Sequence, residues 1–149
     1  MHRSRLNYNI SDFLENIIET LKEPKDGRLI MHLVENPIQD GGQWHMFINL
    51  INKYGVVPQT EMPETFQSSK SMRMNRMITR KLREFAKTLR NVYNKGATIN
   101  ELRSMKEDML STVYRLLIIH LGTPPDRFDW QIRDKKKNFY RFQGLTPKT

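Results

Sequence analysis

The sequence predicts an α+β fold that is mainly helical and ends in a β-hairpin. Over most of residues 11–122, apolar residues recur three and four positions apart, as they do along one face of a helix. After Pro124 and Pro125, apolar residues instead alternate with polar ones, which is typical of strands. With 149 residues, the chain is long enough to bury a sizeable core.

The first half of the chain is expected to contain three helices. The spacing of apolar residues predicts helices over 11–23, over 28–35, and from 42 or 43 to 54. Ser11 or Asp12 is expected to cap the first helix, because both side chains can accept a backbone N–H. Gly55 follows the third helix and suits the left-handed conformation that often ends a helix.

Two longer helices are expected to fold back on each other as an antiparallel hairpin. The first runs to residue 95, with Ser68 or Ser69 as its cap. Thr98 and Glu101 have the spacing of a capping box that opens the second helix, and Gly122 closes it. The short connection between the two helices favours antiparallel packing. A β-hairpin is then expected around the charged turn at residues 134–138.

Composition excludes several kinds of chemistry. The sequence contains no cysteine, so these residues hold no disulfide, no thiolate metal site and no cysteine nucleophile. Its histidines lack the spacing of metal ligands, and we expect no metal or cofactor. No apolar run approaches the ~20 residues of a membrane span. The first residues lack the apolar stretch of a secretory signal, and an intracellular location is compatible with the sequence.

Positive charge is concentrated on one predicted helix. Residues 68–96 carry a net charge of +8, whereas residues 1–67 carry −3 and residues 97–149 carry +4. Six of the cations recur at helical spacing and define what we call the basic stripe: Arg73, Arg76, Arg80, Arg83, Lys87 and Arg90. Such a stripe could make the chain a non-enzymatic helical module that binds the phosphates of a nucleic acid or an acidic partner, or it could be a solvated or subunit-contacting face. No aromatic residues interleave with it to stack on bases.

One ordered set of motifs is far more specific than the periodicity. The chain reads Asn-Pro-Ile-Gln-Asp-Gly-Gly-Gln-Trp over residues 36–44 and Lys-Tyr-Gly-Val-Val-Pro over residues 53–58. Further matches follow at Leu-Arg-Glu-Phe (82–85), Lys-Gly-Ala-Thr (95–98) and Leu-Gly-Thr-Pro-Pro (121–125). Together these segments resemble the bleomycin hydrolase and aminopeptidase C family of papain-like cysteine peptidases. The resemblance covers roughly residues 10–147.

The resemblance implies a papain-like peptidase fold and a cytoplasmic aminopeptidase that removes residues from peptide N-termini. In that family the subunits form a homo-oligomer, a hexamer. The implied division of this chain is a helical part over 1–67, a helical hairpin insertion over 68–122 that contributes to assembly, and the start of a β-rich part over 123–149.

The resemblance also implies that residues 41–44 bind substrate. Gly41 and Gly42 would line the cleft and pair with the backbone of an extended peptide, where a side chain would block the approach. Gln43 and Trp44 would lie near the pocket for the side chain that precedes the scissile residue. Taken without the resemblance, the two glycines would indicate only a tight turn before a helix.

The residues that perform catalysis in this family are expected to lie outside this chain. Papain-like hydrolysis needs a cysteine, a histidine, an asparagine and an oxyanion-hole glutamine. The family places the glutamine and cysteine upstream of the matched region and the histidine and asparagine downstream. We therefore expect the chain alone to be inactive, to pack poorly and to expose an apolar patch. It could be a truncated gene model, an expression fragment or an inactive paralogue.

Overall fold

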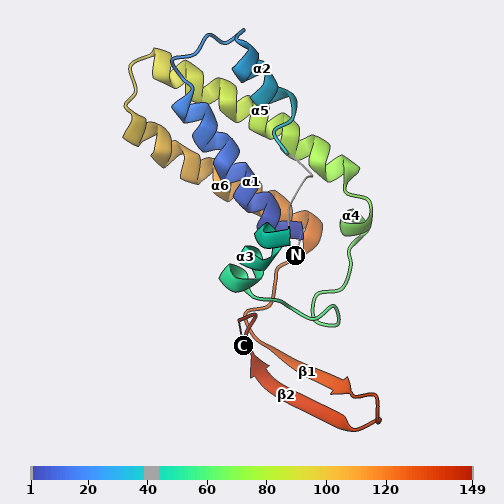
Figure 1. Ribbon diagram of the computed structural model, residues 1–149. Helices are drawn as coiled ribbons and strands as arrows, with labels where there is room; N and C mark the ends of the chain where they lie inside the picture. Colours follow the sequence, from blue (N-terminus) through green and yellow to red (C-terminus); the bar gives the residue numbers. More distant parts are fainter. Residues whose placement is uncertain (1, 39–43, 149) are drawn as a thin grey trace.

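The computed structural model describes residues 2–38 and 44–148 of the chain. Within these ranges the elements follow one another as α1 (His2–Glu19), α2 (Arg28–Glu35), α3 (Trp44–Tyr54), α4 (Phe66–Ser69), α5 (Met72–Asn94), α6 (Ile99–Leu121), β1 (Phe128–Arg133) and β2 (Phe139–Leu145). The molecule is elongated, with a helical bundle at one end and the two strands at the other (Figure 1).

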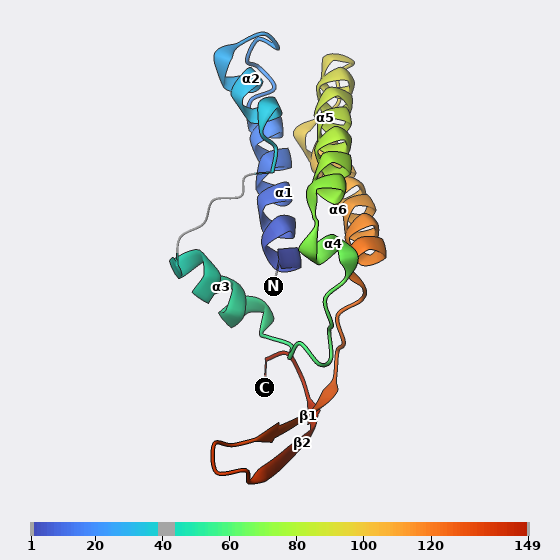
Figure 2. The ribbon, with the colours of Figure 1, turned by 90° about the vertical axis from the view of Figure 1, so that its right-hand side faces the viewer.

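Three long helices form the core. α5 and α6 pack as the predicted antiparallel hairpin, and α1 packs against both of them (Figures 1 and 2). All three helices contribute side chains with no exposed surface, among them Ile10, Leu14, Ile17, Ile78, Leu82, Leu89, Leu102, Val113 and Leu117. Each such side chain contributes roughly 1.5–3 kcal/mol when buried. The hairpin is thus completed by a third helix from the start of the chain.

The first helix differs from its prediction at both ends. α1 begins at His2, so Ser11 lies inside the helix and neither Ser11 nor Asp12 caps it. Its start was missed because residues 2–9 lack the apolar spacing on which the prediction rested. The helix ends at Glu19 rather than at residue 23, and the Thr20 hydroxyl donates to the carbonyl of Asn16 at 2.6 Å.

The fourth predicted helix is divided into α4 and α5. Thr65 caps α4: its hydroxyl accepts from the Ser68 N–H at 3.2 Å, and the Ser68 hydroxyl accepts from the Thr65 N–H at 3.0 Å. Ser68 and Ser69 therefore lie within α4 and do not cap the long helix. Ser71 occupies the N-cap of α5, but its side chain accepts no capping hydrogen bond from a backbone N–H of the helix. A threonine just upstream had the same capping chemistry as the two serines, which is why the pattern misplaced the boundary.

The capping box predicted for α6 is confirmed. The Glu101 N–H donates to the Thr98 hydroxyl at 3.3 Å, and the Thr98 N–H donates to the Glu101 carboxylate at 2.7 Å. The second bond, together with one from the Thr98 hydroxyl, lowers the pKa of Glu101. At the other end, Gly122 follows the helix with φ at +78°, a conformation that favours glycine.

The predicted β-hairpin is also confirmed. β1 and β2 pair antiparallel, and the Asp134 carboxylate accepts the backbone N–H groups of Lys136 at 2.8 Å and Asn138 at 2.9 Å in the turn. Trp130 stacks on Phe142 across the strands, with ring centroids 5.8 Å apart. The hairpin lies away from the helical bundle (Figure 2).

The segment that follows β2 is hydrogen-bonded to the loop after α3. The Val56 N–H donates to the carbonyl of Pro147 at 2.6 Å. Gly55 precedes it with φ at +75°, as predicted for the residue that ends the third helix. This contact joins two segments that are remote in sequence.

Large apolar side chains are exposed both on the helices of the bundle, as at Ile119 and Met72, and outside it. Those outside it lie on α3 and the β-hairpin, and include Trp44, Ile48, Tyr54, Ile132, Phe139, Tyr140 and Phe142. That they form one self-associating patch stays a prediction. The bundle itself has a fully buried core, so the expected poor packing is not found in the helices. Among the residues described, no helix is long and apolar enough to cross a membrane.

An ion-pair cluster joins α1 to α6. The Glu15 carboxylate accepts from Lys106 and from Arg103, whose Nη2 lies 2.7 Å from Oε1. The hydrogen bond from Lys106 is the largest of the causes that lower the pKa of Glu15, and the bond from Arg103 adds to it. Because the folded-state pKa is lowered, the cluster stabilises the fold above the unfolded pKa of about 4.3, and that contribution is lost as the pH falls through the folded pKa.

Replacing Glu15 with glutamine should therefore lower the Tm at pH 7. The difference in Tm between the two proteins should disappear in acid. The expected loss at pH 7 is about 1 kcal/mol or less, because the cluster is at the surface. Thermal unfolding of both proteins from pH 7 to pH 3 measures it. Glu19→Gln, on an exposed position of the same helix, is the control. A Tm difference for Glu15→Gln that stays constant down to pH 3 would contradict the assignment.

Candidate functional site

Of the predicted substrate-binding residues, Trp44 lies within the part of the chain that the structure describes. Gly41, Gly42 and Gln43 lie outside the described residues, so their role stays a prediction. Trp44 is the first residue of α3 and is 74% exposed, with its ring stacked on Phe47 at a centroid distance of 5.1 Å. An indole this exposed is available to contact a peptide or another part of a larger protein. Its assignment to substrate also stays a prediction.

In the sequence, α2 precedes this region, and the residues that follow α2 pack on the bundle. α2 ends at Glu35, and Asn36 is its C-cap. Pro37 is buried, and Ile38 packs against the core of the bundle. Both α2 and α3 contact α1. The helical bundle therefore supports the helices on both sides of the predicted cleft residues.

Two members of the basic stripe have a structural role that the sequence did not indicate. Arg83 donates from Nε to the carbonyl of Val34 at 2.9 Å and from Nη2 to the carbonyl of Glu35 at 2.8 Å. Arg90 donates to the carbonyls of Thr20, at 3.2 Å, and Glu23. Both guanidinium groups thus bind carbonyls at or just beyond the end of a helix, where carbonyls lack partners within the helix. These contacts join segments far apart in sequence, so no local pattern could reveal them.

The other four members of the stripe are exposed. Arg73, Arg76, Arg80 and Lys87 make no hydrogen bond or ion pair with other residues in the described parts of the chain. Their helical spacing places them along one side of α5. These four side chains form a smaller cationic surface than the sequence suggested. Binding of a nucleic acid or another partner by this surface stays a prediction.

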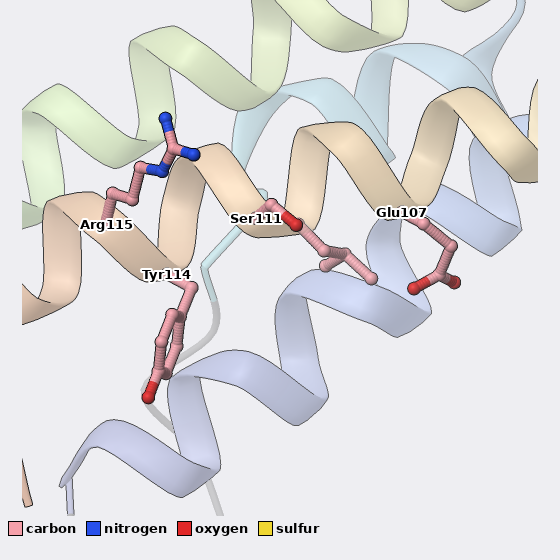
Figure 3. Close-up of a pocket in the computed structure, with 5 residues that line it drawn as sticks. Glu107, Ser111, Tyr114 and Arg115 are labelled. Atoms are coloured by element: carbon pink, nitrogen blue, oxygen red, sulfur yellow. The ribbon is translucent and has the colours of Figure 1, made fainter.

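A hollow on the bundle carries no recognisable catalytic arrangement. Its lining residues all belong to α6: Glu107, Leu110, Ser111, Tyr114 and Arg115. Figure 3 shows Arg115 pointing away from Tyr114, so the polar groups do not converge on one point. Within residues 2–38 and 44–148, no three histidine or acidic side chains approach closely enough to hold a metal ion.

Comparisons with known proteins establish the family. Residues 5–149 match the Peptidase C1-like family, and the chain belongs to it. It is 46% identical over 136 residues to aminopeptidase C of Listeria monocytogenes, covering 91% of this chain and 30% of that protein. It is 44% identical over 137 residues to bleomycin hydrolase of Oryctolagus cuniculus, covering 91% of this chain and 50% of that protein.

A solved structure extends the similarity to three dimensions. The chain superposes on PepW of Lactobacillus rhamnosis with a TM-score of 0.89 and 40% sequence identity, over 97% of this chain and 33% of that one. The predicted fold class and family resemblance are therefore confirmed. The chain spans about a third to a half of the length of these relatives.

Proposed function

We propose that this chain is a segment of a cysteine-type aminopeptidase that removes residues from peptide N-termini. The observation that carries the proposal is the superposition on PepW at 40% identity over nearly the whole chain. The proteins with which it shares 44% and 46% identity are named as a bleomycin hydrolase and an aminopeptidase C. Since the chain has no cysteine, the nucleophile of such an enzyme must come from residues outside these 149. The chain alone therefore has no peptidase activity.

Within that enzyme, residues 41–44 form part of the substrate cleft. Gly41 and Gly42 pair with the backbone of an extended peptide, and Gln43 and Trp44 contact the side chain that precedes the scissile residue. The exposure of Trp44 supports this proposal, as do the contacts of α2 and α3 with α1. Backbone pairing needs glycine because a side chain would keep the peptide away.

A chimera tests the aminopeptidase function. Residues 5–149 replace the matching stretch of the Listeria monocytogenes aminopeptidase C, with which they share 46% identity. Hydrolysis of aminoacyl fluorogenic amides is then measured beside the parent enzyme and the isolated chain. We expect the chimera to be active and the isolated chain to be inactive.

A thiol reagent locates the nucleophile. Iodoacetamide should abolish the activity of the chimera, and because the 149 residues contain no cysteine, the alkylated group must lie in the remaining part. Activity in the isolated chain would contradict the proposal, as would activity that survives alkylation of every thiol.

The enzyme works in the cytoplasm as a homo-oligomer, a hexamer, to which the α5–α6 hairpin contributes contacts. Four members of the basic stripe are exposed and would pair with an acidic surface on a neighbouring subunit: Arg73, Arg76, Arg80 and Lys87. Light scattering on the chimera measures its subunit number. A monomer would contradict this part of the proposal.

A further inference from the structure

The β-hairpin is amphipathic, and its apolar face is exposed. The register pairs Trp130 with Phe142 and Ile132 with Tyr140 across the two strands. Because side chains alternate along a strand, these four lie on one face of the sheet. Trp130 and Phe142 stack on each other, yet Ile132, Tyr140 and Phe142 remain 40%, 46% and 43% exposed.

The opposite face of the hairpin is mainly polar, and its charges are paired within the hairpin. The Asp129 carboxylate lies 3.2 Å from Nη2 of Arg141 and also accepts the Gly144 N–H at 3.0 Å. The Arg133 guanidinium lies over the ring of Phe139, 5.9 Å from its centroid. An antiparallel sheet with one polar and one apolar face is commonly solvated on the first face and packed on the second.

Within the described residues, the sheet has no third strand and packs little on the helices. β1 and β2 contact chiefly each other, and Figure 2 shows the hairpin apart from the helical bundle. A two-stranded hairpin on its own is only marginally stable in water. The superposition on PepW covers 97% of this chain but 33% of that one. The same hairpin therefore occurs in a protein of which about two thirds lies outside the match, which is ample chain to cover the exposed face.

We propose that the apolar face of Trp130, Ile132, Tyr140 and Phe142 binds an apolar surface in the part of the peptidase outside these 149 residues. This inference rests on the proposed function, since that function makes the chain a segment of a larger enzyme. The face joins this segment to the part that carries the nucleophile. The face with Asp129 and its partners stays in contact with solvent.

Thiol labelling tests which face is covered. Because the chain has no cysteine, Ile132→Cys and Gln131→Cys each place a single thiol in it, on opposite faces of β1. Both positions are exposed, so in the isolated chain both thiols should react readily with iodoacetamide. In the chimera, Ile132→Cys should react at least about tenfold more slowly than in the isolated chain, and Gln131→Cys should keep its rate within about twofold. Mass spectrometry of the labelled peptide measures each rate.

The second strand supplies an independent pair of variants. Tyr140→Cys and Phe139→Cys are adjacent, replace aromatic side chains that are both exposed, and lie on opposite faces of β2. They repeat the comparison if a variant in β1 does not fold. Reaction of Ile132→Cys and Tyr140→Cys at their isolated-chain rates in a folded chimera would overturn the inference.

Photocrosslinking identifies what covers the face. With p-benzoylphenylalanine at position 140 of the chimera, crosslinks should map to residues of the Listeria monocytogenes part. Crosslinks confined to residues 5–149 would show that a second copy of this segment covers the face, and would overturn the inference. Neither measurement needs catalysis. A folded, inactive chimera with a protected apolar face contradicts the proposed function alone, whereas an active chimera whose two faces are labelled alike overturns this inference alone.

Discussion

Replacing Gly42 with valine in the chimera should raise KM at least about tenfold and leave kcat within about threefold. The expected cause is steric: a branched side chain at this position would separate the cleft wall from the backbone of an extended peptide. A tenfold loss corresponds to about 1.4 kcal/mol, the size of about one net hydrogen bond. Steady-state kinetics on a series of aminoacyl amides and short peptides measures it.

A matched substitution separates this effect from a general disturbance. Ser104→Val places the same side chain on an exposed position of α6 and should change neither constant beyond about twofold. If Gly42→Val leaves KM unchanged in a folded chimera, the glycine pair serves only as a turn before α3, and the cleft assignment is wrong.

Replacing Gly55 with alanine should destabilise the 149-residue chain by about 2–4 kcal/mol. The new Cβ would stand 1.7 Å from the carbonyl oxygen of Pro147 and 2.7 Å from the backbone nitrogen of Lys148. Both neighbours are backbone atoms, so no side-chain rotation relieves the clash. The left-handed φ of +75° adds strain for any residue with a Cβ. Urea unfolding measures the loss, and hydrogen exchange at Val56 reports whether its bond to Pro147 has broken.

Gly144→Ala controls for backbone strain alone. Gly144 has a similar φ of +64°, but its added Cβ meets no atom within 4 Å. It should cost about 1–2 kcal/mol. If Gly55→Ala costs no more than Gly144→Ala and Val56 stays protected, the contact between the segment after β2 and the loop after α3 does not hold these segments together.

Short sequence patterns predicted the helices and strands whose ends and faces depend on residues close together in the chain. The capping box of Thr98 and Glu101 placed the start of α6, and alternating apolar residues predicted the β-hairpin around Asp134. The start of α1 was missed because helix formation there does not follow apolar spacing. α1 also packs against the hairpin of α5 and α6, a tertiary arrangement that no local pattern encodes.

The substrate-binding residues were predicted from a family motif and not from the physical properties of the residues alone. Without the resemblance, the glycine pair at residues 41 and 42 would suggest only a tight turn. The charge analysis counted Arg83 and Arg90 as part of a surface stripe, whereas both bind helix-end carbonyls from distant parts of the chain. Periodicity reveals which residues share a helix face, but it does not reveal what that face contacts.

The kcat/KM of the chimera tests the central claim most directly. If residues 5–149 are a working segment of an aminopeptidase, the chimera should hydrolyse aminoacyl amides with a kcat/KM within about tenfold of the parent enzyme, a transition-state difference of about 1.4 kcal/mol or less. Iodoacetamide should abolish that activity. A chimera that folds and assembles like its parent yet shows no hydrolysis above background would contradict the account.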